Sequence, residues 1–189
     1  MKTKWLDNTF KYDGSQLKSL YAYINEGILG DSAIAWRGPC DIPWEHMVDG
    51  EDLKAKSTIC GADMIHFLLE KFDCTLLAAV ALQRLLSAIA KDILMETAKN
   101  QEFAQRLHRQ GDDLFVDNKK LSISVATVSP ISSMIHFAVN VSNEGTPVNT
   151  LCLQDLEIAP KKFATELLNR LQTEVNTIIQ ATQKVHWVK

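Results

Sequence analysis

Two aspartates and a lysine lie around the clearest β-hairpin pattern in the chain. The strings DLFV and KLSISVATV flank Asp117-Asn118-Lys119, a composition typical of a hairpin turn. Such a hairpin brings Asp112 or Asp113 close to Lys120. A lysine in a dry pocket is a compact cation that stabilises negative charge on a carbonyl or phosphate oxygen, and a neighbouring carboxylate can orient it. The pattern therefore predicts an electrostatic site, although charges that keep an exposed turn solvated would give the same sequence.

Four further side chains have types suited to binding or catalysis. His66 and His136 lie inside apolar strand patterns, and the near-neutral pKa of histidine suits proton transfer. Arg37 follows an apolar stretch and could bind a carboxylate or a phosphate. Cys152 has a thiol side chain and lies in a segment that suits a strand. Each also has a structural interpretation: a core or pocket-wall histidine, an exposed arginine and a buried strand cysteine.

An acidic group at Asp49, Glu51 and Asp52 offers a different chemistry. Together with a histidine, these carboxylates could hold a divalent metal for a metal-assisted enzyme. The chain contains no CxxC, HExxH, P-loop or EF-hand string, so the strongest metal and nucleotide signatures are absent. We therefore assign no metal ligands from the sequence.

The first third of the chain predicts one helix, one strand and a long loop. Asp13-Gly14-Ser15 forms a turn, and apolar residues at helical spacing from Leu17 to Ile28 predict a helix that Gly27 and Gly30 close. The short apolar run Ser32 to Trp36 predicts a buried strand. No period survives from Arg37 to Cys60, which indicates a loop, and loops of that length are more often functional than idle.

The rest of the chain predicts further strands and two long helices. The run Ala62 to Glu70 suits a strand or a short helix, and Leu76 to Leu94 suits a buried helix. Strands are expected at Ile135 to Val141 and at Thr150 to Leu156. Pro160 suits the first position of a terminal helix. This order of elements predicts a single α+β domain, residues 1–189, with a mainly antiparallel or mixed sheet and packed helices.

Composition limits the partners that this domain could have. The chain has 189 residues and 46% hydrophobic residues, and 20 basic against 23 acidic residues give a net charge of −3. Nucleic-acid binders are usually basic, so no nucleic-acid partner is expected. No apolar run resembles a signal peptide or a membrane span, and the four cysteines lack short spacings. We expect a cytoplasmic protein with reduced thiols and no membrane partner.

The hairpin segment resembles the central motif of the biotin and lipoate protein ligase and octanoyl-transferase superfamily. In that motif Asn-Asp-Leu precedes a hairpin that carries the catalytic lysine; Asp112 falls on its Asn, Asp113 on its Asp and Lys120 on its lysine. The string IHFAVNV is similar to the superfamily's Gly-x-x-Asn-Val strand and places Asn140 on its asparagine. MVDGEDL, MIHF and RQGDDL look typical of a branch whose function is unknown.

The resemblance implies a ligase-like core over residues 13–158, class II synthetase-like, with a C-terminal helix at 159–184. It implies recognition of an acyl or carboxylate compound and acyl transfer. Lys120 would be the catalyst, Asp113 its partner and Cys152 the nucleophile. Ligand-binding residues would be Asp112, Asn140, Arg37, His66 and His136. ATP or an acyl-adenylate is the implied cofactor, and a carrier protein or a second copy of the chain an implied partner.

The chain departs from this superfamily in the loop that should hold phosphate. The ligases carry a glycine- and arginine-rich loop whose backbone N–H groups wrap the adenylate. Here that region reads RGPCD followed by MVDGEDLKAKSTICG, without a glycine cluster. Ile123 also replaces a family glycine after the lysine. The alternative hypothesis is therefore a non-catalytic small-molecule-binding or assembly protein that retains the fold without the adenylate loop.

Overall fold

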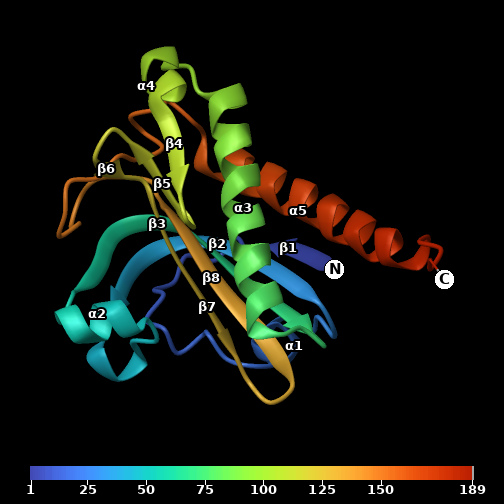
Figure 1. Cartoon of the computed structure of the whole chain (residues 1–189). Helices are drawn as coiled ribbons and strands as arrows, with labels where there is room; N and C mark the ends of the chain where they lie inside the picture. Colours follow the sequence, from blue (N-terminus) through green and yellow to red (C-terminus); the bar gives the residue numbers. More distant parts are fainter. Residues whose placement is uncertain (189) are drawn as a thin grey trace.

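A five-stranded mixed sheet forms the centre of the computed structural model, which describes residues 1–188 (Figure 1). The strand order is β1-β2-β3-β8-β7; β1 and β2 are parallel and the other neighbours are antiparallel. The predicted α+β architecture with a mixed sheet is confirmed. The strands are β1 Lys2–Trp5, β2 Ser32–Ile42, β3 Ile59–Phe72, β7 Ser122–Val128 and β8 Ser132–Asn140.

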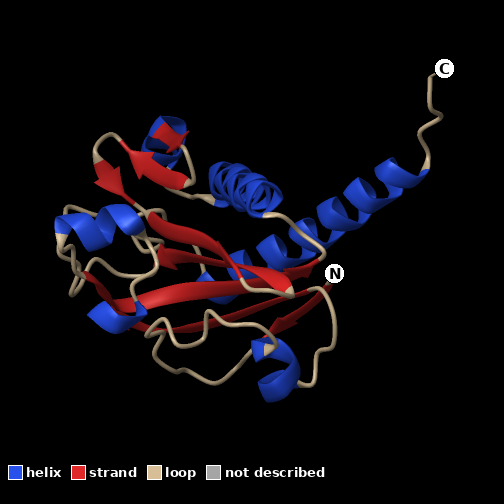
Figure 2. Ribbon diagram, turned by 60° about the horizontal axis from the view of Figure 1, so that its bottom comes forward, coloured by secondary structure: helices blue, strands red, loops and turns tan. Residues whose placement is uncertain are grey.

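Two long helices cover one face of this sheet. They are α3, Leu76–Thr97, and α5, Pro160–Gln183, and their apolar sides pack against residues of β2, β3 and β8 in the larger core (Figures 1 and 2). Thr75 caps α3, since its hydroxyl accepts a hydrogen bond from Ala78 N at 3.2 Å. Pro160 is the first residue of α5, as predicted. Beyond Val175 the helix leaves the core, and its end projects past the sheet (Figure 2).

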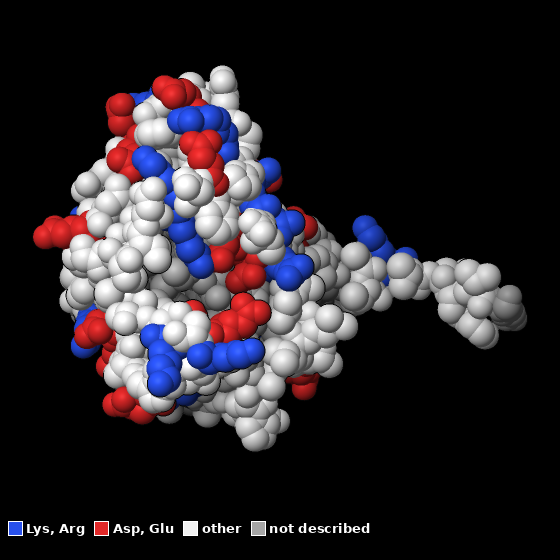
Figure 3. Space-filling model, turned by 60° about the vertical axis from the view of Figure 1, so that its left-hand side comes forward, with Lys and Arg blue, Asp and Glu red and all other residues white. Residues whose placement is uncertain are grey.

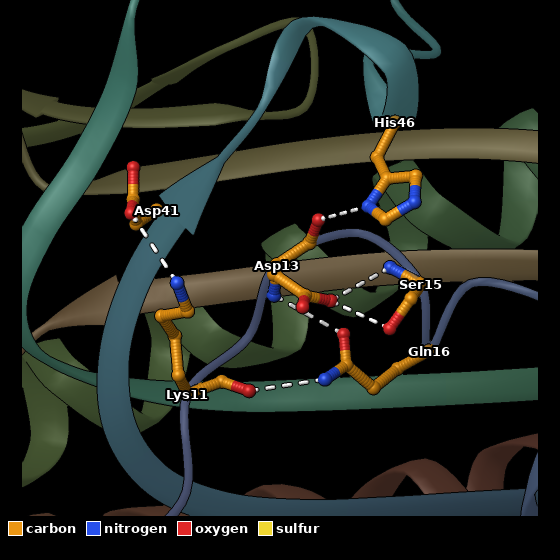
Figure 4. Close-up of polar contacts among 6 residues, drawn as sticks. All are labelled: Lys11, Asp13, Ser15, Gln16, Asp41 and His46. Atoms are coloured by element: carbon orange, nitrogen blue, oxygen red, sulfur yellow. Dashed lines mark hydrogen bonds and ion pairs between the residues drawn. The ribbon is translucent and has the colours of Figure 1, made fainter.

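The opposite face of the sheet is covered by the N-terminal segment rather than by a long helix. Phe10 stacks on Trp36 with ring centroids 4.7 Å apart, and Tyr12 is buried in a second core with residues of β2, β3 and β8. The turn after Tyr12 is fixed by polar contacts (Figure 4). The Asp13 carboxylate accepts hydrogen bonds from the backbone and side chain of Ser15, and His46 Nδ1 donates to Asp13 O.

The predicted hairpin forms a second, smaller sheet beside the main one. Its strands are β4 Leu107–Gln110, β5 Asp113–Val116 and β6 Lys119–Lys120, and α4, Gln101–Arg106, leads into it. Asp117 takes the turn with φ 54°, a conformation that aspartate tolerates better than most residues. Within the described residues, no helix is both long and apolar enough to cross a bilayer.

The first predicted helix is much shorter than its apolar spacing indicates. Only α1, Tyr21–Glu26, is helical, because Leu20 adopts φ 64° and its N–H is captured by the buried Glu70 carboxylate. Gly27 ends the helix at φ 68°, as expected.

The predicted strand end at Trp36 and the long loop after it are wrong. Strand β2 continues to Ile42, with a bulge between Gly38 and Cys40 that accommodates Pro39 without a ladder hydrogen bond. A short 3₁₀ helix, Trp44–His46, and the helix α2, Gly50–Ala55, occupy most of the rest. The run Ala62 to Glu70 lies within β3 and is a strand.

The strand predicted at Thr150 to Leu156 is also wrong. A single bridge joins Thr150 to Lys120, and the chain then turns at once. The Asp155 carboxylate accepts a hydrogen bond from Cys152 N at 3.0 Å, which closes a local turn in place of a ladder.

Candidate functional site

A cavity of about 380 Å³ lies at one end of the face that the N-terminal segment covers. Its walls come from that segment, from the hairpin β5–β6, from β7 and β8, and from the region around α2. The segment Thr146–Thr150 adds part of the rim. The volume is within the range typical of small-molecule sites. The residues that line the cavity include Tyr12, His46, Asp49, Glu51, Asp52, Asp112, Asp113, Lys120, His136 and Asn140.

The hairpin brings Lys120 and Asp113 together at the cavity wall. Lys120 Nζ lies 2.7 Å from Asp113 Oδ2, and the lysine side chain is 32% exposed. Burial raises the pKa of the Asp113 carboxyl group, an effect that the neighbouring Lys120 ammonium opposes. The predicted pair is therefore present, and both of its residues line the cavity.

Two polar residues fix the positions of the strands that carry this pair. Asp112 Oδ2 accepts a hydrogen bond from Gln83 Nε2 at 2.8 Å, which ties the start of β5 to α3. Asn140 Nδ2 donates to Lys120 O at 3.3 Å and to Leu151 O at 3.1 Å. Because both amide hydrogens are used in this way, Asn140 holds the Lys120 backbone against β8.

The charged side chains of the cavity lining are predominantly acidic. Five of the lining residues are acidic and one is a lysine. The side of the molecule in Figure 3 is hollowed near its centre, with acidic and basic side chains around the hollow. Asp49 is engaged in capping α2, since its carboxylate accepts hydrogen bonds from Glu51 N and Asp52 N. In residues 1–188 no three His, Cys, Asp or Glu side chains are placed so that together they could hold a metal ion, and the hypothesis of a metal-assisted enzyme therefore gains no support.

The two histidines form a stacked pair at the inner wall. His66 is fully buried, with Nε2 3.1 Å from Gly38 O and Nδ1 3.1 Å from His136 Nε2. His136 is 1% exposed and lines the cavity, whereas His66 lies behind it. Burial lowers the pKa of His66 to about 4 and lowers the pKa of His136 well below its usual value. Both imidazoles are therefore neutral near pH 7.

Tyr12 and His46 also line the cavity, although no sequence pattern indicates a functional role for either residue. Tyr12 stacks on His136 with ring centroids 3.6 Å apart, and burial raises the pKa of its hydroxyl group. His46 donates from Nδ1 to Asp13 O, which directs its other nitrogen away from that contact (Figure 4). Both come from segments without a regular hydrophobic period, so no local pattern could have identified them.

Arg37 and Cys152 lie outside the cavity lining. Arg37 is in the middle of β2, where its guanidinium group pairs with both oxygens of Asp63. Cys152 is buried, and its Sγ lies 3.2 Å from Asp155 Oδ2. Burial raises the pKa of the Cys152 thiol to about 11, which disfavours the thiolate that a nucleophile requires. The structure thus unites Asp112, Asp113, Lys120, His136 and Asn140 at the cavity but separates Arg37 and Cys152 from it.

Burial predicts a clear division among the four free thiols. Cys60 and Cys74 are partly exposed, whereas Cys40 and Cys152 are buried, and burial raises the pKa of Cys40 to about 12. Ellman's reagent at pH 8 is expected to modify two thiols of the folded protein rapidly and all four in urea. Cys152→Ser should leave the rapid phase unchanged, and Cys60→Ser should halve it. Rapid labelling of Cys152 would contradict this assignment.

The fold is similar to that of biotin and lipoate protein ligases. The structure of the biotin protein ligase from Aquifex aeolicus in complex with biotin and ATP aligns with a TM-score of 0.59 and 12% identity, over 93% of this chain and 70% of that one. The chain itself belongs to the family described as Domain of unknown function (DUF366), whose model matches residues 1–186.

Two relatives have substantial sequence identity to the chain. The structure of a Protein of Unknown Function from Pyrococcus horikoshi aligns with a TM-score of 0.90 and 39% identity, over 99% of this chain and 100% of that one. Uncharacterized protein MJ0805 from Methanocaldococcus jannaschii is 33% identical over 164 residues, which are 84% of this chain and 72% of that protein. The similarity to both proteins therefore extends over most of the chain.

Proposed function

We propose that the protein binds a small acyl or carboxylate compound in the cavity, with the carbonyl or carboxylate oxygen placed on Lys120. The observation that carries this proposal is the position of the Lys120 ammonium group, which is partly exposed at the wall of a cavity of about 380 Å³. A charge-assisted hydrogen bond from an ammonium group to an oxygen is strong in such a sheltered position. Apolar lining residues such as Leu17 and Ile123 suit the hydrocarbon part of the compound.

The residues of the cavity do not fit the phosphate of an adenylate. The lining has five acidic side chains and one lysine, which is already paired with Asp113, so it has no surplus of positive charge for the several negative charges of ATP, whereas an acyl carbonyl or a single carboxylate needs only one hydrogen-bond donor. Arg37, which lies in the segment that corresponds to the phosphate loop of the ligases, is paired with Asp63 outside the cavity lining. Binding without adenylate formation is therefore the form of the proposal that the geometry supports best.

The binding proposal predicts a specific requirement for Lys120. Lys120→Met retains the aliphatic stem but removes the charge, and it is expected to weaken the binding of nonanoate at least ten-fold, since one hydrogen bond to a charged group contributes about 1.5–3 kcal/mol. Isothermal titration calorimetry on the intact protein measures this change.

Lys119→Met is the matched control for that experiment. Lys119 belongs to the same short strand, but its ammonium group lies 5.8 Å from the centroid of the Phe103 ring and it does not line the cavity. Its replacement should leave the affinity within two-fold. Equal losses in the two variants, or no loss in Lys120→Met, would refute the role of Lys120.

Acyl transfer is the second candidate function, and the contact of Lys120 with Asp113 favours it. An oriented ammonium group could stabilise the oxyanion that forms when an acceptor amine, or water in its absence, attacks the thioester carbonyl group; the C–S bond then breaks and the leaving thiolate takes up the proton that the attacking group loses. After incubation with an octanoyl thioester, intact mass spectrometry and the release of free thiol test this candidate. Release that is lost in Lys120→Met would favour transfer, and ligand-induced thermal stabilisation without release would favour binding alone.

A further inference from the structure

The hydrogen bonds of the histidine pair determine which ring nitrogens carry protons. Gly38 O can only accept, so His66 Nε2 is protonated and donates to it. Since His66 is neutral, its Nδ1 is an acceptor, and the proton in the contact with His136 must come from His136 Nε2. His136 is neutral as well, and its Nδ1 therefore has a lone pair and no proton.

This lone pair has no donor within the protein. His136 Nδ1 makes no hydrogen bond with any residue from 1 to 188, although the residue is only 1% exposed and lines the cavity. The hydroxyl group of Tyr12, whose ring lies against that of His136, also has no partner in the same part of the chain. Both atoms are accessible from the cavity, since within residues 1–188 Ser32 Oγ is the only fully buried side-chain polar atom without a partner, and they are therefore available to pair with a group that occupies the cavity.

We infer that the ligand donates a hydrogen bond to His136 Nδ1, and that it is an acyl compound with a neutral hydroxyl or amide N–H group at the end remote from its carbonyl group. This inference rests on the proposed function, which places the carbonyl oxygen on Lys120. Tyr12 Oη, which can both donate and accept, would complete the contact with the same group.

The positions of the residues along β8 separate the two ends of the ligand. His136 and Asn140 are four residues apart on the same strand, so their side chains point to the same face of the sheet with about 13 Å between them. Asn140 holds the Lys120 backbone, and hence the carbonyl end of the site lies near Asn140. The hydrogen-bond acceptor on His136 therefore lies at the opposite end of the site from the carbonyl group. This separation suits an acyl chain that has a polar group at its terminus.

The surroundings of His136 favour a neutral donor over an ammonium group. Tyr12 and His66 pack against its ring, and none of the three carries a charge near pH 7. The acidic side chains from the hairpin, Asp112 and Asp113, lie at the Lys120 end. Burial of an ammonium group without a carboxylate partner is costly, whereas a hydroxyl or amide N–H group needs only the acceptor that is present.

Two acids of nearly equal size test this inference. In 8-hydroxyoctanoate a terminal hydroxyl group takes the place of the terminal methyl group of nonanoate. The intact protein is expected to bind 8-hydroxyoctanoate at least ten-fold more tightly by calorimetry, and Lys120→Met should weaken the binding of both acids. Equal affinities that both depend on Lys120 would overturn the inference and leave the proposed function in place. If neither acid binds, both fail.

Substitution of His136 and its protonation state provide two further readouts. His136→Phe removes the acceptor but retains an aromatic ring beside Tyr12, so it should abolish the preference for the hydroxy acid over nonanoate. If this variant does not fold, two-dimensional ¹⁵N NMR of the unsubstituted protein still decides the question. His136 is expected to show a protonated Nε2 and an unprotonated Nδ1, and a protonated Nδ1 would overturn the inference without reference to any ligand.

Discussion

The free energy of unfolding is expected to fall by about 4 kcal/mol between pH 7.5 and pH 5. The cause is the buried pair His66 and His136, whose pKa values burial lowers, that of His66 to about 4. An unfolded histidine has a pKa of about 6.5, so below that pH the unfolded chain binds protons that the folded chain excludes. This stabilisation is complete above the unfolded pKa and is lost as the pH falls, by about 2 kcal/mol per imidazole at pH 5.

Urea unfolding at a series of pH values measures this dependence. His136→Phe is expected to remove about half of it, because one buried imidazole remains. His108→Gln is the control, since His108 is exposed and its replacement should leave the slope unchanged. A flat profile between pH 7.5 and pH 5 would show that the pair takes up protons in the folded state. Most small domains are stable by only about 5–15 kcal/mol, so the expected loss is readily measured.

The local sequence pattern was sufficient for those parts of the fold that depend on near neighbours. The turn at Asp117 and the alternation after it specify the hairpin, and the hairpin alone brings Asp113 to Lys120. Pro160 and the apolar stripe behind it likewise specify α5. These elements are local, because their hydrogen bonds join residues close in sequence or their burial follows a regular period.

The inner end of the cavity depends on contacts that no local pattern contains. His66 and His136 were selected as candidates, but their contact requires the register between β3 and β8, which pairs residues about seventy positions apart. Tyr12 joins them only because the N-terminal segment packs over β2. Cys152 was placed in a strand by composition, whereas the carboxylate of Asp155 turns the chain there.

The shortened first helix and the lengthened second strand have the same kind of cause. Leu17 to Ile28 has helical spacing, but the buried Glu70 carboxylate from β3 binds Leu20 N and holds that residue in a left-handed conformation. Gly38 and Pro39 are residues typical of loops, but pairing with β3 extends strand β2 past both of them, with a bulge at this position. In both places a partner distant in sequence overrides the local preference.

Gly38→Ala is expected to destabilise the protein by about 3 kcal/mol or more. A Cβ atom at this position would lie 2.0 Å from Phe10 O and 2.8 Å from Phe10 C, and both are backbone atoms that no side-chain rotation can move. Phe10 O also accepts a hydrogen bond from Trp36 Nε1 at 3.1 Å, so its displacement breaks a buried contact as well as the ring stack. Overpacking of this kind typically costs about 1–3 kcal/mol, and a lost hydrogen bond adds to it.

Gly50→Ala is the matched control, because a Cβ atom there meets nothing within 4 Å and the residue lies in the first turn of α2. The stability of this control should be unchanged or slightly raised, since alanine favours a helix over glycine.

The Gly38 variant should also lose affinity for nonanoate. The segment that Phe10 anchors carries Tyr12 into the cavity, and Gly38 O accepts the hydrogen bond from His66 Nε2. Urea unfolding and calorimetry on both variants separate the two effects. Unchanged stability in Gly38→Ala would mean that the N-terminal segment can shift without loss, and the inner wall of the cavity would then be adaptable rather than fixed.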